Sequence, residues 1–160
     1  MTDEVLMRAG TKNSSRRGDR GATQIEFVVS ILIILFTIFA VFEFCMVVHA
    51  MNVLADAARE GVRYAIVHGV NNSNCSGPNP GTNCATPDVA ADNVKTVVRG
   101  YAKLTLKNIS AINIAVNYPD GNNAPRSRVT VAITYNYLPY VHLPGLTPVL
   151  KAHAQGRIVN

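Results

Sequence analysis

The longest hydrophobic pattern in the chain is an apolar run over residues 25–48, which acids interrupt only near its two ends. Residues 28–42 carry no charge, while Glu26 and Glu43 lie close to the limits of the run. As a helix, this run would rise about 36 Å at about 1.5 Å per residue. That length exceeds the ~30 Å hydrocarbon core of a bilayer. We therefore predict a membrane-spanning helix whose two carboxylates reach the headgroups.

The helical pattern continues beyond the apolar run. Residues 51–68 are helix-forming, and only Gly61 interrupts them before Gly69. We therefore expect one long helix over about residues 23–67, with its first half in lipid and its second half emerging on the far side. Glu60 and Arg63 are neighbours on such a helix and can form an ion pair.

The emerging half of this helix carries a stripe of mostly small residues at three- and four-residue spacing. Its members are Ala50, Leu54, Ala57, Gly61 and Tyr64. Small residues on one face allow a second helix to approach closely. Two interpretations remain open, because the stripe can pack against the chain's own soluble part or against neighbouring subunits.

The remainder of the chain predicts one more helix and a small sheet. A hydroxyl, a proline and an acid at residues 86–88 indicate a helix start, and residues 89–107 follow as an amphipathic helix. Its expected apolar face consists of Val94, Val97, Val98, Tyr101 and Leu104. Residues 112–118 and 129–135 alternate as strands around a turn at residues 119–123 and predict an antiparallel hairpin. Residues 151–159 can add a third strand.

The expected fold class is therefore α+β. A three-stranded antiparallel sheet would pack on the second helix and on the upper half of the long helix, a layout that resembles pilins in general architecture. We expect three segments: a basic leader at residues 1–21, a transmembrane helix at 22–48 and a periplasmic domain at 49–160.

The loop between the two helices contains two cysteines, Cys75 and Cys84, among Asn, Gly, Pro and Ser residues. An oxidising compartment outside the cytoplasm would favour a disulfide between them. Free thiols and a metal site are the alternatives, although His68 is the only histidine nearby and a metal needs more ligands. Cys45 lies in the apolar helix, where we expect it to act as a small apolar filler.

The distribution of the net charge of +5 predicts the orientation of the membrane span. Basic residues outnumber acids in the N-terminal arm, and Lys and Arg that flank a membrane span stay on the cytoplasmic side. The basic residues are Arg8, Lys12, Arg16, Arg17 and Arg20. We expect no nucleic-acid partner, because no basic stripe interleaved with aromatic residues follows the arm.

Catalysis is not expected from this sequence. The histidines, His49, His68, His142 and His153, do not show the spacing of metal ligands. No glycine-rich phosphate loop and no nucleophile motif is present. We therefore predict a protein that is not an enzyme, with no catalytic residues, no metal, no cofactor and no small-molecule substrate.

Three motifs in a fixed order resemble the TadE-like family. They are Arg20-Gly21-Ala22-Thr23 followed by Glu26-Phe27, then Glu43-Phe44 after the apolar run, then Ala58-Arg59-Glu60-Gly61 followed by Arg63-Tyr64-Ala65. The resemblance covers roughly residues 16–68. Family members often have Tyr after the glutamate, and Phe27 keeps the aromatic ring at that position.

This resemblance implies a minor pilin or pseudopilin of the tight-adherence (Tad) pilus, a type IVb-like system of bacteria. In that family a prepilin peptidase cuts after the glycine, here Gly21, so that Ala22 becomes the N-terminus and Glu26 the fifth residue. The implied partners are the membrane, the peptidase, other pilins and Tad assembly proteins. Ala57, Ala58, Arg59, Glu60, Gly61, Arg63 and Tyr64 would form a surface for subunit or helix packing.

The implied location is the bacterial inner membrane, crossed once, with the N-terminus cytoplasmic, the C-terminal domain periplasmic, and later entry into a pilus possible. Two alternatives remain open. An unprocessed membrane-anchored envelope protein would make Gly21 and Glu26 incidental. A cleaved secretory signal would release the domain near residues 48–50, although its apolar region should be only about 7–15 residues long.

Overall fold

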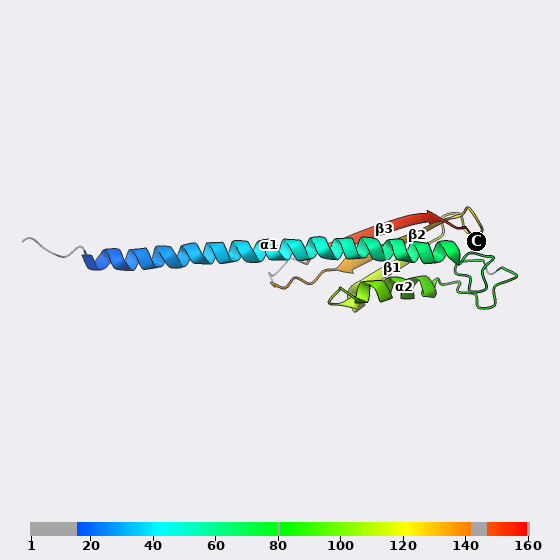
Figure 1. The fold of residues 1–160 in the computed structure, drawn as a ribbon, viewed down its shortest axis with the longest axis horizontal. Helices are drawn as coiled ribbons and strands as arrows, with labels where there is room; N and C mark the ends of the chain where they lie inside the picture. Colours follow the sequence, from blue (N-terminus) through cyan, green and yellow to red (C-terminus); the bar gives the residue numbers. More distant parts are fainter. Residues whose placement is uncertain (1–15, 80, 142–146, 160) are drawn as a thin grey trace, which may run out of the picture. The chain divides into compact units, whose positions relative to one another are not determined.

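A computed structural model describes residues 16–79, 81–141 and 147–159 (Figure 1). The chain divides into two compact units, Met1–Val41 and Phe42–Asn160. Residues 1–15 of the predicted leader, with Arg8 and Lys12, lie outside the described residues, as does His142.

Helix α1 spans Arg16–Val67 and starts earlier than the predicted residue 23, but ends at the predicted position. It is long because no proline and only three glycines, Gly18, Gly21 and Gly61, lie within its bounds. Within it, Gly21–Val67 is long and apolar enough to cross a membrane, and the most apolar part has no buried residue. These properties fit a single-pass membrane protein.

The second unit combines the C-terminal part of α1 with one more helix and a sheet. Its elements are α2 (Asp92–Lys103), the short 3-10 helix η1 (Ile109–Ala111), and strands β1 (Ile112–Asn117), β2 (Arg128–Asn136) and β3 (Val149–Arg157). The sheet order is β1-β2-β3, and both pairs are antiparallel. The predicted α+β class and three-stranded sheet are therefore confirmed.

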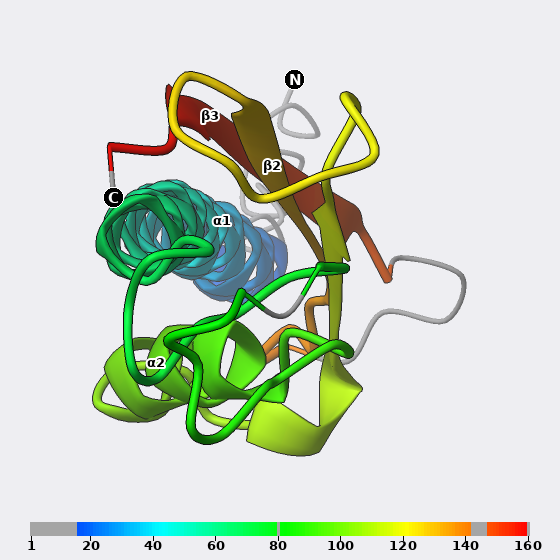
Figure 2. The same cartoon turned by 90° about the vertical axis from the view of Figure 1, so that its right-hand side faces the viewer.

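Both helices of this unit lie on the same side of the sheet (Figure 2). Alternation explains the arrangement, because every second residue of β2 is buried, including Val129, Val131 and Ile133. These side chains form a core with Leu54 of α1 and Val94 of α2, both fully buried. At about 25 cal/mol per Å² of apolar surface removed from water, this shared core is the main stabilising contribution to the unit.

The predicted limits of the second helix were wrong at both ends. Helix α2 begins at Asp92, and Asp88 lies outside it, with a carboxylate that accepts hydrogen bonds from the backbone N–H groups of Asp92 and Asn93, both at 2.8 Å. The acid therefore satisfies free N–H groups of the first turn from a preceding loop rather than from inside the helix. At the other end, α2 stops at Lys103 rather than near residue 107.

The apolar face of α2 also differs from the prediction. Val94 and Val98 are buried as expected, but Ala102 takes the next buried position, four residues on. Tyr101 is 41% exposed and Leu104, which follows the last helical residue, is 83% exposed. The buried stripe is thus a narrow row with four-residue spacing, and the large residues beside it point to solvent.

Candidate functional site

The residues at the start of the apolar helix are exposed. Gly21, Ala22, Glu26 and Phe27 all lie on α1, and no atom would come within 4 Å of a Cβ added at Gly21. Among the described residues, Glu26 has no hydrogen-bond or ion-pair partner. A carboxylate beside a continuous apolar surface is costly in lipid unless another group neutralises it. This part of α1 therefore presents an unpaired negative charge and an open glycine.

The small residues of the stripe have partners within their own chain. Leu54 and Ala57 of the stripe are fully buried, as is the adjacent Ala58. A Cβ at Gly61 would lie 2.4 Å from Cγ2 of Val98, closer than real Cβ contacts allow. Of the two interpretations, the structure shows packing of this stripe against the chain's own helix α2 and sheet.

The charged residues between the small ones face solvent. Arg59 pairs with Asp56 at 2.8 Å, and Arg63 lies 3.8 Å from Glu60, the pair that the sequence predicts. Exposed pairs at this spacing contribute at most about 0.5 kcal/mol each. This solvent face of α1 is therefore available for contacts with another subunit.

Tyr64 closes the stripe near the end of α1. Its ring stacks on the imidazole of His68, with 3.8 Å between the ring centroids. Burial, followed by the charge of Asp88, raises the pKa of Tyr64 above its ordinary value. The stacked ring acts as a packing group.

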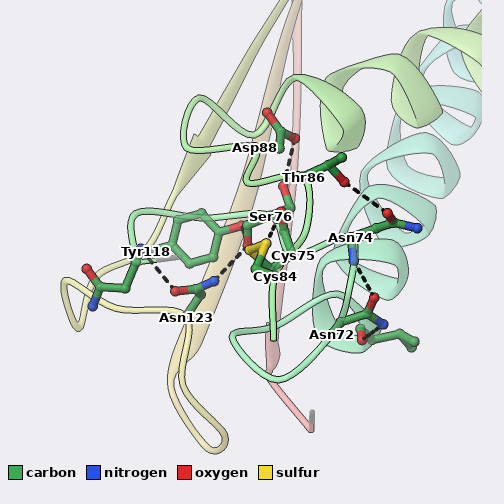
Figure 3. Close-up of a disulfide and its surroundings, with 11 residues drawn as sticks. Asn72, Asn74, Cys75, Ser76, Cys84, Thr86, Asp88, Tyr118 and Asn123 are labelled. Carbon is green, nitrogen blue, oxygen red and sulfur yellow. Dashed lines mark hydrogen bonds between the residues drawn. A yellow bond between two sulfur atoms is a disulfide. The ribbon is translucent and has the colours of Figure 1, made fainter. Parts of the chain in front are cut away.

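Cys75 and Cys84 form a disulfide, so the predicted bond is confirmed and the free-thiol and metal alternatives are excluded (Figure 3). Ser76, beside the bond, donates a hydrogen bond from Oγ to the Asp88 carboxylate at 3.0 Å. The Ser76 carbonyl accepts hydrogen bonds from the Tyr118 hydroxyl at 3.0 Å and the Asn123 amide at 3.3 Å. The disulfide loop is thereby joined both to the start of α2 and to the β1–β2 turn.

Asn123 is a central residue that sequence reasoning missed. It was assigned to an ordinary turn, yet its side chain is fully buried and accepts a hydrogen bond from the Asn79 N–H at 3.1 Å. A buried amide needs such partners, because leaving it unsatisfied costs about 1–3 kcal/mol. The composition of the turn gave no signal that distinguished Asn123 from its neighbour Asn122.

Glu43 is the second residue whose position was not foreseen. We expected its carboxylate to reach the headgroups, but it accepts hydrogen bonds from the Tyr137 hydroxyl at 2.9 Å and from the N–H groups of Tyr140 at 3.1 Å and Val141 at 3.4 Å. Burial, then the hydrogen bond to Glu43, raises the pKa of Tyr137. Two tyrosines just after a predicted strand were the available signal, but nothing in the sequence pairs them with residue 43.

An ion pair closes the loop between β1 and β2. Nη2 of Arg128 lies 2.6 Å from Oδ1 of Asp120, and the same carboxylate accepts the Arg128 backbone N–H at 2.8 Å. These hydrogen bonds lower the pKa of Asp120 to about 2. Within the part of the chain that the structure describes, no three His, Cys, Asp or Glu side chains gather as metal ligands.

The comparison with known families concerns helix α1. The family described as TadE-like protein matches residues 21–63. Residues 21–63 are TadE-like. The resemblance drawn from the sequence is confirmed over this TadE-like segment, which contains the exposed glutamate, the apolar surface and most of the small-residue stripe. The segment is less than half of the chain, so α2 and the sheet lie outside it.

No curated protein and no solved structure matches the chain. The match to the TadE-like family over residues 21–63 is therefore the finding that suggests a Tad pilus-associated protein.

Proposed function

We propose that this protein is a minor pilin or pseudopilin that acts in the assembly or initiation of a Tad type IVb pilus. The observation that carries the proposal is the TadE-like segment at residues 21–63, in which Glu26, without a partner among the described residues, stands at the start of an exposed apolar helix surface. The proposed role is structural and non-enzymatic. Its proposed location is the inner membrane, with residues 1–21 in the cytoplasm, residues 22–48 across the membrane and residues 49–160 in the periplasm.

Processing is the first step of the proposed function. A prepilin peptidase cuts after Gly21 and leaves Ala22 as the new N-terminus. Open space around Gly21 supports this step, because packing does not require a glycine there. A glycine in a helix costs about 1 kcal/mol relative to alanine, so recognition by an enzyme is a reason for its presence that folding does not supply.

Glu26 then directs assembly. In lipid its unpaired charge is unfavourable, and the α-ammonium group of Ala22 in a neighbouring subunit can neutralise it. Other pilins and Tad assembly proteins are therefore the proposed partners. The exposed face with Arg59 and Arg63 offers them a second contact on the same helix.

The deciding experiment is intact mass and N-terminal sequencing of the detergent-extracted protein from cells with and without the prepilin peptidase. We expect a chain that starts at Ala22 only when the peptidase is present. Gly21→Leu should block cleavage while the helix still forms. Gly100→Leu is the matched control, because Gly100 is also helical and has open space around it.

Two other results would assign the protein to a different class. A full-length chain in both strains would identify an unprocessed membrane-anchored envelope protein. A chain that begins near Met51 in both strains would identify a secreted domain released by a signal peptidase. Either result would rule out the pilin class.

A further inference from the structure

Exposed apolar and aromatic side chains gather at the end of the second unit where α1 enters it. We define this surface as the rim: Phe42, Leu104, Lys107, Leu138, Tyr140 and Val141. Leu104 is 83% exposed, and the other apolar members are between 39% and 52% exposed. Single exposed apolar residues are ordinary, but neighbouring ones, such as Phe42 in contact with Tyr140, indicate an interaction surface.

The rim is a built surface rather than a loose loop. Glu43 accepts the backbone N–H groups of Tyr140 and Val141, which fixes this segment against α1. The rings of Phe42 and Tyr140 meet edge to face with centroids 6.2 Å apart. Nζ of Lys107 lies 4.6 Å from the centroid of the Tyr140 ring, which joins the segment after α2 to the same surface.

The charge around the rim is positive. Arg99, Lys103 and Lys107 follow one another at four-residue spacing, and all three are exposed. Residues 93–119 contain no Asp or Glu. The nearby acid Glu43 is already engaged by Tyr137, Tyr140 and Val141.

Chain connectivity indicates what covers the rim. Phe42, a member of the rim, is also the last residue of the charge-free run over residues 28–42. Tyr side chains concentrate at membrane–water interfaces, and each Lys near an anionic surface is attracted to it. The rim thus combines the residue types of an interface with direct covalent continuity to the membrane span.

We propose that the rim contacts the surface of the bilayer, with its apolar side chains at headgroup depth and Lys103 and Lys107 against anionic phospholipid. This inference depends on the membrane insertion in the proposed function, but on neither cleavage at Gly21 nor pilus assembly. Within the second unit, the disulfide loop and the β1–β2 turn lie at the other end from the rim (Figure 1).

The absence of tryptophan from the chain makes a direct test possible, because one introduced indole is the only one present. The full chain carrying Leu104→Trp is reconstituted in phosphatidylcholine–phosphatidylglycerol vesicles whose acyl chains are brominated near the headgroup. We expect quenching and a blue shift of its emission. Val89→Trp is the matched control: Val89 is 59% exposed and precedes α2, whereas Leu104 follows it. We expect no quenching of that indole.

Phe39→Trp reports insertion of the span in the same vesicles. Quenching of the Phe39→Trp indole without quenching of the Leu104→Trp indole would overturn the inference and leave the rim as a surface for a protein partner. If the Phe39→Trp indole were also unquenched, the inference would fall together with the membrane part of the proposed function. If the intact mass showed an uncleaved chain in cells with the peptidase, and both the Phe39→Trp and Leu104→Trp indoles were quenched, the pilin assignment would fall and this inference would stand.

A charge variant tests the lipid chemistry. Lys103→Gln in the Leu104→Trp background should lower rim contact about fivefold in anionic vesicles, the effect of one Lys near such a surface. In vesicles of phosphatidylcholine alone, the variant and its parent should be quenched equally. Equal quenching in anionic vesicles would remove anionic phospholipid from the proposal.

Discussion

Two glycines of α1 show how one residue type can serve opposite purposes. Gly61 is required by packing, because a Cβ there would lie 2.4 Å from the buried side chain of Val98. Gly21 has no such neighbour, and its role, if the proposed processing is right, depends on an enzyme rather than on the fold. From the sequence alone, the two glycines would be assigned the same free-energy cost in a helix relative to alanine.

Gly61→Ala is expected to destabilise the second unit by about 1–3 kcal/mol, the usual cost of overpacking a core. Gly100→Ala should instead stabilise it by about 0.5–1 kcal/mol, because that helical position has open space. Urea unfolding of the detergent-solubilised chain, followed by circular dichroism, measures both. Equal midpoints for Gly61→Ala and the parent would show that α2 moves aside without cost.

Glu26→Gln is expected to abolish piliation while leaving membrane insertion unchanged, because the amide keeps the shape but cannot neutralise an α-ammonium group. The measurement combines pilus counts by electron microscopy with membrane fractionation. Asp92→Asn is the control, since it removes an exposed carboxylate of α2, outside the TadE-like segment. Normal piliation with Glu26→Gln would contradict the proposed charge pairing.

At the scale of elements, periodicity predicted the long helix and the hairpin well, and burial explains why. Strand β2 alternates strictly between buried and less buried positions, so its buried residues are the ones that the hydrophobic pattern of the sequence predicts. Helix α2 was predicted less well for two reasons. Its start depends on Asp88, which lies in a loop, and the third buried residue of its face, after Val94 and Val98, is the small Ala102. Neither feature leaves an apolar pattern in the sequence.

The β1–β2 hairpin is expected to weaken in acid. Its Asp120 has a pKa lowered from 3.8 to about 2 by Arg128, so the stabilisation is complete above pH 3.8 and is lost as the pH falls through about 2. Titration of the Asp120 carboxyl carbon by NMR measures this directly. Arg128→Ala should return the pKa toward 3.8, and an unchanged midpoint in that variant would assign the shift to another cause.

At the scale of the whole molecule, the contacts that sequence patterns could not predict are those that join distant segments. Glu43 and Tyr137 are 94 positions apart, and Asn79 and Asn123 are 44 apart. Polar residues in loops carry no periodic signal, so their partners emerge only when the packed elements bring them together. The candidate site divides in the same way: the sequence motifs single out Gly21 and Glu26 as candidates, while the Glu43 contacts required the structure.

Glu43→Ala is expected to release residues 137–141 without unfolding the sheet, because it removes the acceptor for two backbone N–H groups and a hydroxyl. Hydrogen bonds to a charged group contribute about 1.5–3 kcal/mol each. Hydrogen exchange at the Tyr140 and Val141 amides should therefore accelerate, while exchange in β2 stays unchanged. Tyr137→Phe, which keeps both amide bonds, should leave the two amides protected, and slow exchange in Glu43→Ala would show that Glu43 does not hold the segment.

The exposed apolar surface of α1 also determines how long a single copy stays in a membrane. Fourteen Ile, Leu, Val and Phe side chains lie between Ile25 and Phe42, and all are exposed. At roughly 0.3–0.6 kcal/mol for each at mid-membrane, they favour lipid over water by about 4–8 kcal/mol. Spontaneous escape of a lone subunit is therefore rare, and any fibre that receives it must surround this helix with an equally apolar lining.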